Sequence, residues 1–275
     1  MLTTLTETWT LQESQDEQCV YPSMSQDGTV IASGRVKTQF PRTVVVQTYS
    51  MTEKKWTVYR DIANGGAIII SPDGSQLAFA TYDDKPGTPV RIHFINLKTR
   101  TESVSPVIGR YNGRMLSWSP DGRRIVYEMN ESPLFEKPTI HILDIETEKL
   151  TKIADGAAPA WSPSGEWIAY FNNSKGWVTG TERKGNTQWY IPPETDQVSM
   201  IRPDGTSFKT LVTLPRGKMF MGVPVWSPDS TKILLNELWN EPKFTMSIHL
   251  LDLTTGKLTR KFKDTPIVYA WAEAK

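Results

Sequence analysis

Short runs of alternating apolar and polar residues follow one another along the chain, and turn-forming residues separate them. The runs at 76–80, 124–127 and 167–170 each come shortly after a phrase that reads Ser-Pro-Asp-Gly or differs from it at one position. Alternation with a period of two predicts β-strands. Proline at the second position of the phrase and glycine at the fourth suit a tight turn. Each phrase therefore predicts a hairpin between two strands.

The phrase recurs along the chain. Its serines are Ser25, Ser71, Ser119, Ser162 and Ser227, spaced by 46, 48, 43 and 65 residues. A third run, rich in isoleucine and leucine, occurs at 92–97, 140–145 and 248–253, each time with a histidine 22 residues after the serine. A further turn leads to a fourth run, as at 149–153 and 257–261. A four-stranded antiparallel unit of about 45 residues that repeats in this way predicts an all-β fold, the β-propeller.

The repeats predict one domain and a blade count. Five complete repeats cover about 19–61, 62–109, 110–156, 157–215 and 216–264. Residues 267–271 align with the first strand of a sixth repeat, and residues 8–12 match an outer strand that would complete it. We therefore expect a single propeller of six blades, in which 265–275 and 1–18 together form the closing blade. A five-bladed ring is the alternative.

The amino-acid sequence of the repeat resembles that of a known family. Trp-Ser-Pro-Asp-Gly is followed by Ile-Val-Tyr or Ile-Ala-Tyr, then by an Ile-x-x-x-Asp-Leu strand and a Thr-x-Gly-Lys-Leu-Thr turn. This pattern resembles the repeat of TolB-type propellers and is similar to the propeller domains of prolyl oligopeptidases, from about residue 19 to 272. Families with this repeat include periplasmic interaction proteins, gating domains of peptidases and pectin-degrading lyases. The resemblance implies the fold and leaves the function open.

Charge and composition exclude several classes of partner. The chain has 31 basic and 30 acidic side chains, a net charge of +1, so a general electrostatic attraction to nucleic acid or an anionic membrane is not expected. No stretch reaches the roughly 20 apolar residues that span a bilayer. A single cysteine, Cys19, excludes an intramolecular disulfide. The first ten residues lack the features of a signal peptide, which predicts a cytoplasmic protein, or a periplasmic one if Met1 replaces a removed signal.

The three histidines of the chain, His93, His141 and His249, occupy one repeat position. Equivalent residues on the third strands of neighbouring blades would lie about 15 Å apart, too far to share a metal ion. We expect each histidine to pack between blades and to bond within its own repeat. No Gly-x-Ser-x-Gly elbow or dinucleotide fingerprint is present. The sequence therefore predicts no catalytic residue, no metal site and no cofactor.

The tryptophans suggest a recognition surface. Seven of the ten, among them Trp118, Trp161 and Trp226, recur at strand positions and are expected in the core. The other three are expected in loops between second and third strands, and two of those fall in a 15-residue insertion of the fourth repeat. Exposed aromatic residues beside arginine suit a binding hot spot, although the tryptophans could instead pin the insertion to the propeller. The candidate binding residues are Trp177, Arg183, Lys184, Trp189, Tyr190, Trp239, Arg216 and Phe220.

The leading hypothesis is a non-enzymatic, monomeric propeller module that binds a protein or peptide. One alternative is a carbohydrate-binding or pectin-lyase-like propeller, because tryptophan faces suit sugar stacking. Such a lyase would need a metal cluster and a base, for which only carboxylates such as Asp83, Asp84 and Glu237 remain. A second alternative is a sensor domain of a larger assembly.

Overall fold

The structure is a computed structural model. It describes residues 17–37, 43–63, 65–81, 89–109, 115–130, 138–172, 180–184, 187–191, 196–214, 218–239 and 245–263. Within these ranges there is no helix of the length and apolarity needed to cross a bilayer.

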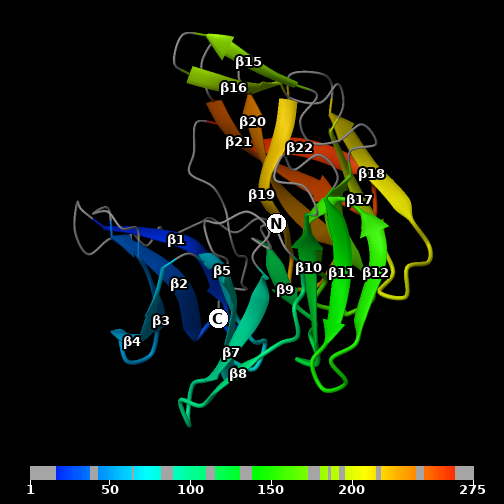
Figure 1. The fold of residues 1–275 in the computed structure, drawn as a ribbon. Helices are drawn as coiled ribbons and strands as arrows, with labels where there is room; N and C mark the ends of the chain where they lie inside the picture. Colours follow the sequence, from blue (N-terminus) through cyan, green and yellow to red (C-terminus); the bar gives the residue numbers. More distant parts are fainter. Residues whose placement is uncertain are drawn as a thin grey trace.

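Five four-stranded antiparallel sheets form the blades of a propeller (Figure 1). Blade 1 consists of β1 (Glu17–Met24), β2 (Val30–Lys37), β3 (Thr43–Ser50) and β4 (Lys55–Ile62). Blade 2 consists of β5 (Gly65–Ile70), β6 (Gln76–Thr81), β7 (Arg91–Asn96) and β8 (Glu102–Val104). Blade 3 consists of β9 (Leu116–Trp118), β10 (Arg124–Met129), β11 (Thr139–Asp144) and β12 (Leu150–Asp155).

Blade 4 carries the insertion expected in the fourth repeat. It consists of β13 (Ala157–Trp161), β14 (Ile168–Asn172), β17 (Asp196–Ile201) and β18 (Lys209–Leu214). Between β14 and β17 the chain forms a separate hairpin of β15 (Gly180–Lys184) and β16 (Thr187–Ile191). Blade 5 consists of β19 (Lys218–Trp226), β20 (Lys232–Trp239), β21 (Thr245–Asp252) and β22 (Lys257–Lys263).

The all-β propeller predicted from the repeat is confirmed, and the described residues form five blades. The sixth, composite blade was expected from 1–18 and 265–275. Apart from the start of β1, those segments lie outside the described residues.

Hydrogen bonds explain why the same turn phrase recurs between the first two strands of the blades. In blade 2 the Ser71 hydroxyl donates to Asp73 Oδ1 at 2.6 Å and accepts the Gln76 amide at 2.9 Å. The Gly74 amide donates to the Ser71 carbonyl at 2.9 Å, and the φ of Gly74 is 71°, a left-handed value that favours glycine. Serine, aspartate and glycine each make one part of the turn.

The core consists of apolar clusters between neighbouring sheets. Clusters join blade 1 to 2, 2 to 3, 3 to 4 and 4 to 5. Among the described residues, no such cluster joins blade 5 to blade 1. The face of blade 1 that points away from blade 2 and the face of blade 5 that points away from blade 4 nevertheless carry buried apolar residues. Val45 of β3 is 1% exposed, and Ile248 and Leu250 of β21 are 5% and 9% exposed. These residues alternate with neighbours that face blades 2 and 4.

Serine side chains also tie blades together beside the propeller axis. Ser23 Oγ accepts the Ile70 amide of blade 2 at 2.9 Å and donates to the Ile68 carbonyl at 3.2 Å. Two blades further along, Ser117 Oγ accepts the Trp161 amide of blade 4 at 3.0 Å. Both serines stand two residues before the serine of the turn phrase, so they hold first strands of adjacent sheets at a fixed spacing.

Candidate binding site

The first strands of the five blades surround an axial pocket. Its walls are formed by residues of β1, β5, β9, β13 and β19 and by the turns that follow these strands, and its volume is about 280 Å³. Figure 1 shows the labelled first strands β1, β5, β9 and β19 converging toward the middle of the molecule, with β4, β8 and β12 farther out. The pocket therefore opens on the face that carries the Ser-Pro-Asp-Gly turns.

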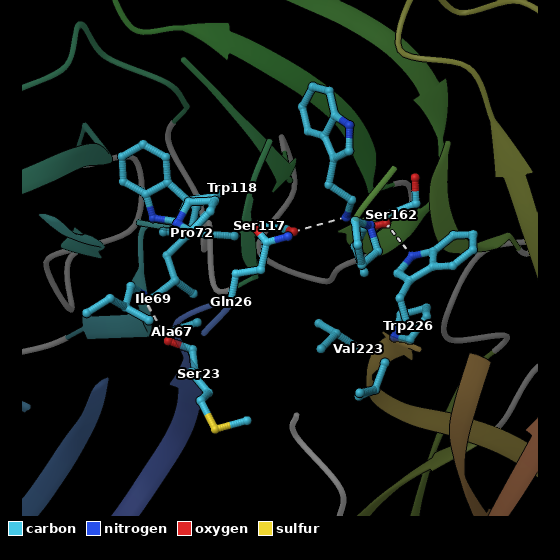
Figure 2. Close-up of a pocket in the computed structure, with 18 of the residues that line it drawn as sticks. Ser23, Gln26, Ala67, Ile69, Pro72, Ser117, Trp118, Ser162, Val223 and Trp226 are labelled. Carbon is cyan, nitrogen blue, oxygen red and sulfur yellow. Dashed lines mark hydrogen bonds between the residues drawn. The ribbon is translucent and has the colours of Figure 1, made fainter. Parts of the chain in front are cut away.

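The described residues that line the pocket include no charged side chain. Trp118, Trp161 and Trp226 form part of the wall and are 5–7% exposed, and Figure 2 shows Trp118 and Trp226 there. The polar groups are Gln26 and the hydroxyls of several serines. Seven prolines complete the wall: Pro22, Pro72, Pro120, Pro159, Pro163, Pro224 and Pro228. An apolar lining with few polar groups is typical of a ligand site.

The three tryptophans differ in what their indole nitrogens bind. Trp226 Nε1 donates to the Ala160 carbonyl at 3.0 Å, and Trp161 Nε1 donates to the Gly165 carbonyl at 3.2 Å. Trp118 Nε1 is buried and has no hydrogen-bond partner within the described part of the chain. Buried donors are usually paired, so this N–H is an exception in the packed part of the wall.

Four aspartates stand one residue beyond the wall of the pocket, in the turns. Asp27, Asp73, Asp121 and Asp229 occupy the third position of four of the five turns and are exposed. The hydrogen bond from Ser227 lowers the pKa of Asp229 to about 2, and the bond from Ser71 likewise lowers the pKa of Asp73. These two carboxyl groups are therefore ionised well below neutral pH.

Sequence reasoning did not predict this pocket. Trp118, Trp161 and Trp226 were assigned to the core from their periodicity alone, and the structure shows that the same residues also form the wall of the pocket. The signal was the position itself, because the residues just before each turn serine belong to the innermost strand of a propeller blade.

The candidate residues of the insertion lie at the opposite end of blade 4. The chain leaves the blade after Asn172 and returns at Asp196, at the other end of β14 from the turn at 162–165. In the hairpin, Glu182 pairs with Trp189, Thr181 with Tyr190, and Lys184 with Thr187. Because consecutive positions alternate between faces, positions 189 and 190 belong to opposite faces of the ribbon. Arg183, next to Lys184, shares the face of Tyr190.

Two candidates occupy strands rather than loops. Trp239 was expected in a loop, but it is the last residue of β20 and pairs with Lys218 and Thr245. The expected surface position of Phe220 is wrong. β19 begins at Lys218, so Phe220 lies inside the strand, 1% exposed, with its ring stacked on Phe171 of blade 4 at 5.3 Å. Trp177 and Arg216 fall outside the described residues.

The histidines bond within their own blades, as expected. His93 Nε2 shares a hydrogen bond of 2.9 Å with Thr81 Oγ1, and its Nδ1 lies 2.6 Å from Glu102 Oε1. His141 Nε2 bonds Thr139 Oγ1 at 3.0 Å. His249 Nε2 contacts the carboxylate of Glu237 on β20. Across the described ranges, no three His, Cys, Asp or Glu side chains are grouped so that they could hold a metal ion.

Thr81, His93 and Glu102 are hydrogen-bonded in the order of a hydroxyl, imidazole and carboxylate relay. Contacts to neighbouring residues hold this series within the packing between blades 1 and 2. Arg60 of blade 1 bonds both oxygens of Glu102, at 2.7 and 2.8 Å, and His93 stacks on Phe79 at 5.3 Å. None of these residues lines the axial pocket. The series therefore connects blade 1 to blade 2.

Sequence similarity to known proteins is limited. No protein-family model matches the chain. The uncharacterized protein Atu1656 of Agrobacterium fabrum is 26% identical over 154 residues, which cover 53% of this chain and 44% of that protein. The match thus spans less than half the length of this curated relative.

Solved structures show the same architecture. TolB from Acinetobacter baumannii matches with a TM-score of 0.65 and 15% identity over 93% of this chain and 57% of the TolB chain. An oligogalacturonate lyase in complex with manganese matches with a TM-score of 0.55 and 15% identity, over 90% of this chain and 67% of the lyase. The β-propeller domain of the trilobed protease from Pyrococcus furiosus, described as having an open velcro topology, matches with a TM-score of 0.55 and 14% identity over 91% and 72%. In structure, the chain resembles the propellers of TolB and of peptidases.

Proposed function

We propose that the protein is a non-enzymatic propeller module that binds a protein or peptide through its axial pocket. The observation that carries this proposal is the uncharged wall of proline, tryptophan and aliphatic residues around a volume of about 280 Å³. A volume of this size accommodates one or two side chains of a ligand. An extended segment can insert such side chains between the first strands without rearrangement of the blades.

The test compares a blocked pocket with an intact one. Peptides are selected from a random display library on the wild-type protein, and their affinities are then measured for Val223→Trp, which fills the pocket, and for Val58→Trp. Val223 lines the pocket (Figure 2), whereas Val58 is 46% exposed on the outer strand β4. We expect at least a tenfold loss of affinity for the first variant and none for the second. Equal affinities for both variants would refute binding at the axis.

We propose the rim that carries Trp177, Trp189 and Trp239 as a second contact surface for a large partner. The support comes from the topology. The insertion leaves blade 4 at the end opposite its turn, and the start of β19 and the end of β20 lie at the corresponding end of blade 5. Arg183 and Lys184 of the hairpin add positive charge to this rim.

The lyase alternative receives less support. The matching oligogalacturonate lyase structure is a complex with manganese, and no group of three metal-binding side chains occurs in the parts of this chain that the structure describes. Glu237, one of the carboxylates considered for such a site, is 5% exposed and contacts His249.

We also propose that a sixth blade, formed by 265–275 and the residues before β1, lies between blade 5 and blade 1. The support is the burial of Val45, Ile248 and Leu250 on faces that meet no described sheet. A covering sheet accounts for that burial. The alternative is an open ring, the topology described for the trilobed protease propeller.

A further inference from the structure

The axial pocket and its mouth have contrasting chemistry. The wall is uncharged, whereas an aspartate directly follows a pocket-lining residue in four turns. Pro72 precedes Asp73, Pro120 precedes Asp121, and Gln26 precedes Asp27 in blade 1. The carboxylates are thus fixed one residue beyond the wall, and the turn hydrogen bonds that hold them also favour the ionised form.

Cations of the protein neutralise this ring in part. Asp121 lies 3.5 Å from Arg124 Nη2, and Asp229 lies 3.9 Å from Lys232 Nζ. The carboxylate of Asp73 accepts hydrogen bonds from Ser71 and Ser75 and has no cation within ion-pair distance among the described residues. The mouth therefore offers negative charge to a ligand, most directly at blade 2.

The wall offers an apolar surface to a ligand. Trp118 is 7% exposed and packs in one cluster with Ala67 and Ile69, which also line the pocket (Figure 2). A large apolar side chain of an inserted segment matches a lining of this kind.

We propose that the pocket recognises an extended peptide in which one large apolar side chain is flanked by lysine or arginine. The apolar side chain fills the axial volume, and the flanking cations meet the aspartates of the turns. One bulky side chain on an extended backbone suits a volume of about 280 Å³. This inference rests on the proposed function, because it names the ligand of the same pocket.

The experiment uses four fluorescein-labelled pentapeptides and measures anisotropy with the full chain. The first has tryptophan between two pairs of lysines. The second and third replace the lysines by glutamines or glutamates, and the fourth keeps the lysines but replaces tryptophan by serine. We expect the lysine-flanked tryptophan peptide to bind at least tenfold more tightly than the glutamate and serine peptides, and its advantage over the glutamine peptide to shrink in 0.5 M salt.

Matched variants locate the charge. Asp73→Asn keeps the turn acceptor while it removes the charge, and Asp252→Asn makes the same change in the outer turn between β21 and β22, where Asp252 accepts from Thr254. We expect Asp73→Asn to weaken the lysine-flanked peptide about two- to fivefold and Asp252→Asn to have no effect. The indole N–H resonance of Trp118, assigned with Trp118→Phe, should shift on binding, because Trp118 lines the pocket.

The outcomes separate this inference from the proposed function. If the lysine and glutamine peptides bind equally and both lose affinity in Val223→Trp, the pocket binds peptides but the requirement for basic flanks is wrong. If no tryptophan peptide binds more tightly than the serine peptide, the inference is wrong, and loss of the library-selected peptides as well would refute the proposed function. An unmoved Trp118 resonance would refute insertion of the ligand beside this tryptophan.

Discussion

Trp226 of blade 5 donates its indole N–H to the main-chain carbonyl of Ala160 in blade 4, over 3.0 Å. The bond crosses between the first strands of two sheets beside the axial pocket. Trp118 occupies the equivalent position in blade 3 with a similar burial and no described partner for its nitrogen. The pair permits a direct measurement of what the cross-blade bond contributes.

Phenylalanine at each position gives that measurement. Trp226→Phe leaves the Ala160 carbonyl without its donor, whereas Trp118→Phe breaks no described hydrogen bond. Both changes remove similar apolar volume, so we expect Trp226→Phe to lower the free energy of unfolding by about 1 kcal/mol more than Trp118→Phe. Urea unfolding followed by circular dichroism measures the difference. Equal losses would mean that the bond adds nothing to stability.

Acid should destabilise the protein through the turn aspartates. The folded-state pKa of Asp229 is lowered to about 2 by its bonds to Ser227 and Thr231, below the ordinary value near 3.9. The stabilisation is present above about pH 4 and is lost as the pH falls toward 2. Asp229→Asn should therefore melt at a lower temperature than wild type at pH 6, and the gap should narrow as the pH falls toward 3.

The control for this measurement is Asp155→Asn. Asp155 is 79% exposed and pairs with Lys152 at the surface, where an ion pair contributes little. Scanning calorimetry at pH 6, 4 and 3 compares the three proteins. A gap for Asp229→Asn that stays constant across this range would contradict the role assigned to its carboxylate.

Tyr127 should tolerate loss of its hydroxyl group. Burial raises the pKa of Tyr127 well above its usual value, and Oη has no hydrogen-bond partner among the described residues. An unpaired buried hydroxyl is unfavourable, so Tyr127→Phe should leave the melting temperature unchanged or raise it by up to about 3 °C. Tyr127→Leu, which also removes the ring stacked on His141 at 5.6 Å, should lower it. A drop for Tyr127→Phe would reveal a partner for the hydroxyl.

The rim tryptophans should matter for binding more than for folding. Replacing Trp177, Trp189 and Trp239 by alanine should change the free energy of unfolding by less than about 0.5 kcal/mol per site. Trp118→Ala should cost about 3 to 5 kcal/mol, because it leaves a cavity in the core. Thermal unfolding of both variants tests the contrast. A comparable loss in the two would make the rim tryptophans anchors of the insertion and end their proposed role in recognition.

Deleting residues 1–16 tests the sixth blade. The deletion leaves β1 intact and should expose an unpaired sheet edge, which promotes self-association. We expect a lower melting temperature and oligomers by light scattering. A monomeric truncated protein with the wild-type melting temperature would favour an open ring.

The blade structure was readable from the sequence because each turn depends on contacts within a few residues. Ser71, Asp73 and Gly74 bond one another, and the same phrase reports the same hairpin wherever it occurs. The histidines stand 22 residues after the serines in three repeats, and each bonds within its own blade as the repeat predicts. Local chemistry and periodicity together were sufficient for the fold.

The site was not readable in the same way, since it depends on contacts between repeats. Trp118 and Trp226 look identical in the sequence, yet one nitrogen has a partner in the preceding blade and the other has none described. Phe220 follows a basic, glycine-containing segment typical of a loop, but pairing with Glu237 draws it into β19 and against Phe171. Neither outcome is encoded within a single repeat.

The apolar clusters between the blades connect them in series, in the same order as the chain. A pulling force applied to the two ends of the chain would therefore open the proposed closing blade and then load blades 1 and 5. Blades 1 and 5 are each held by one described cluster, whereas the middle blades are each held by two. Under tension the molecule should lengthen in steps of one blade, beginning at either end, and blade 3, with Ile125 and Tyr127 at one side and Val126 and Ile140 at the other, should be among the last to yield.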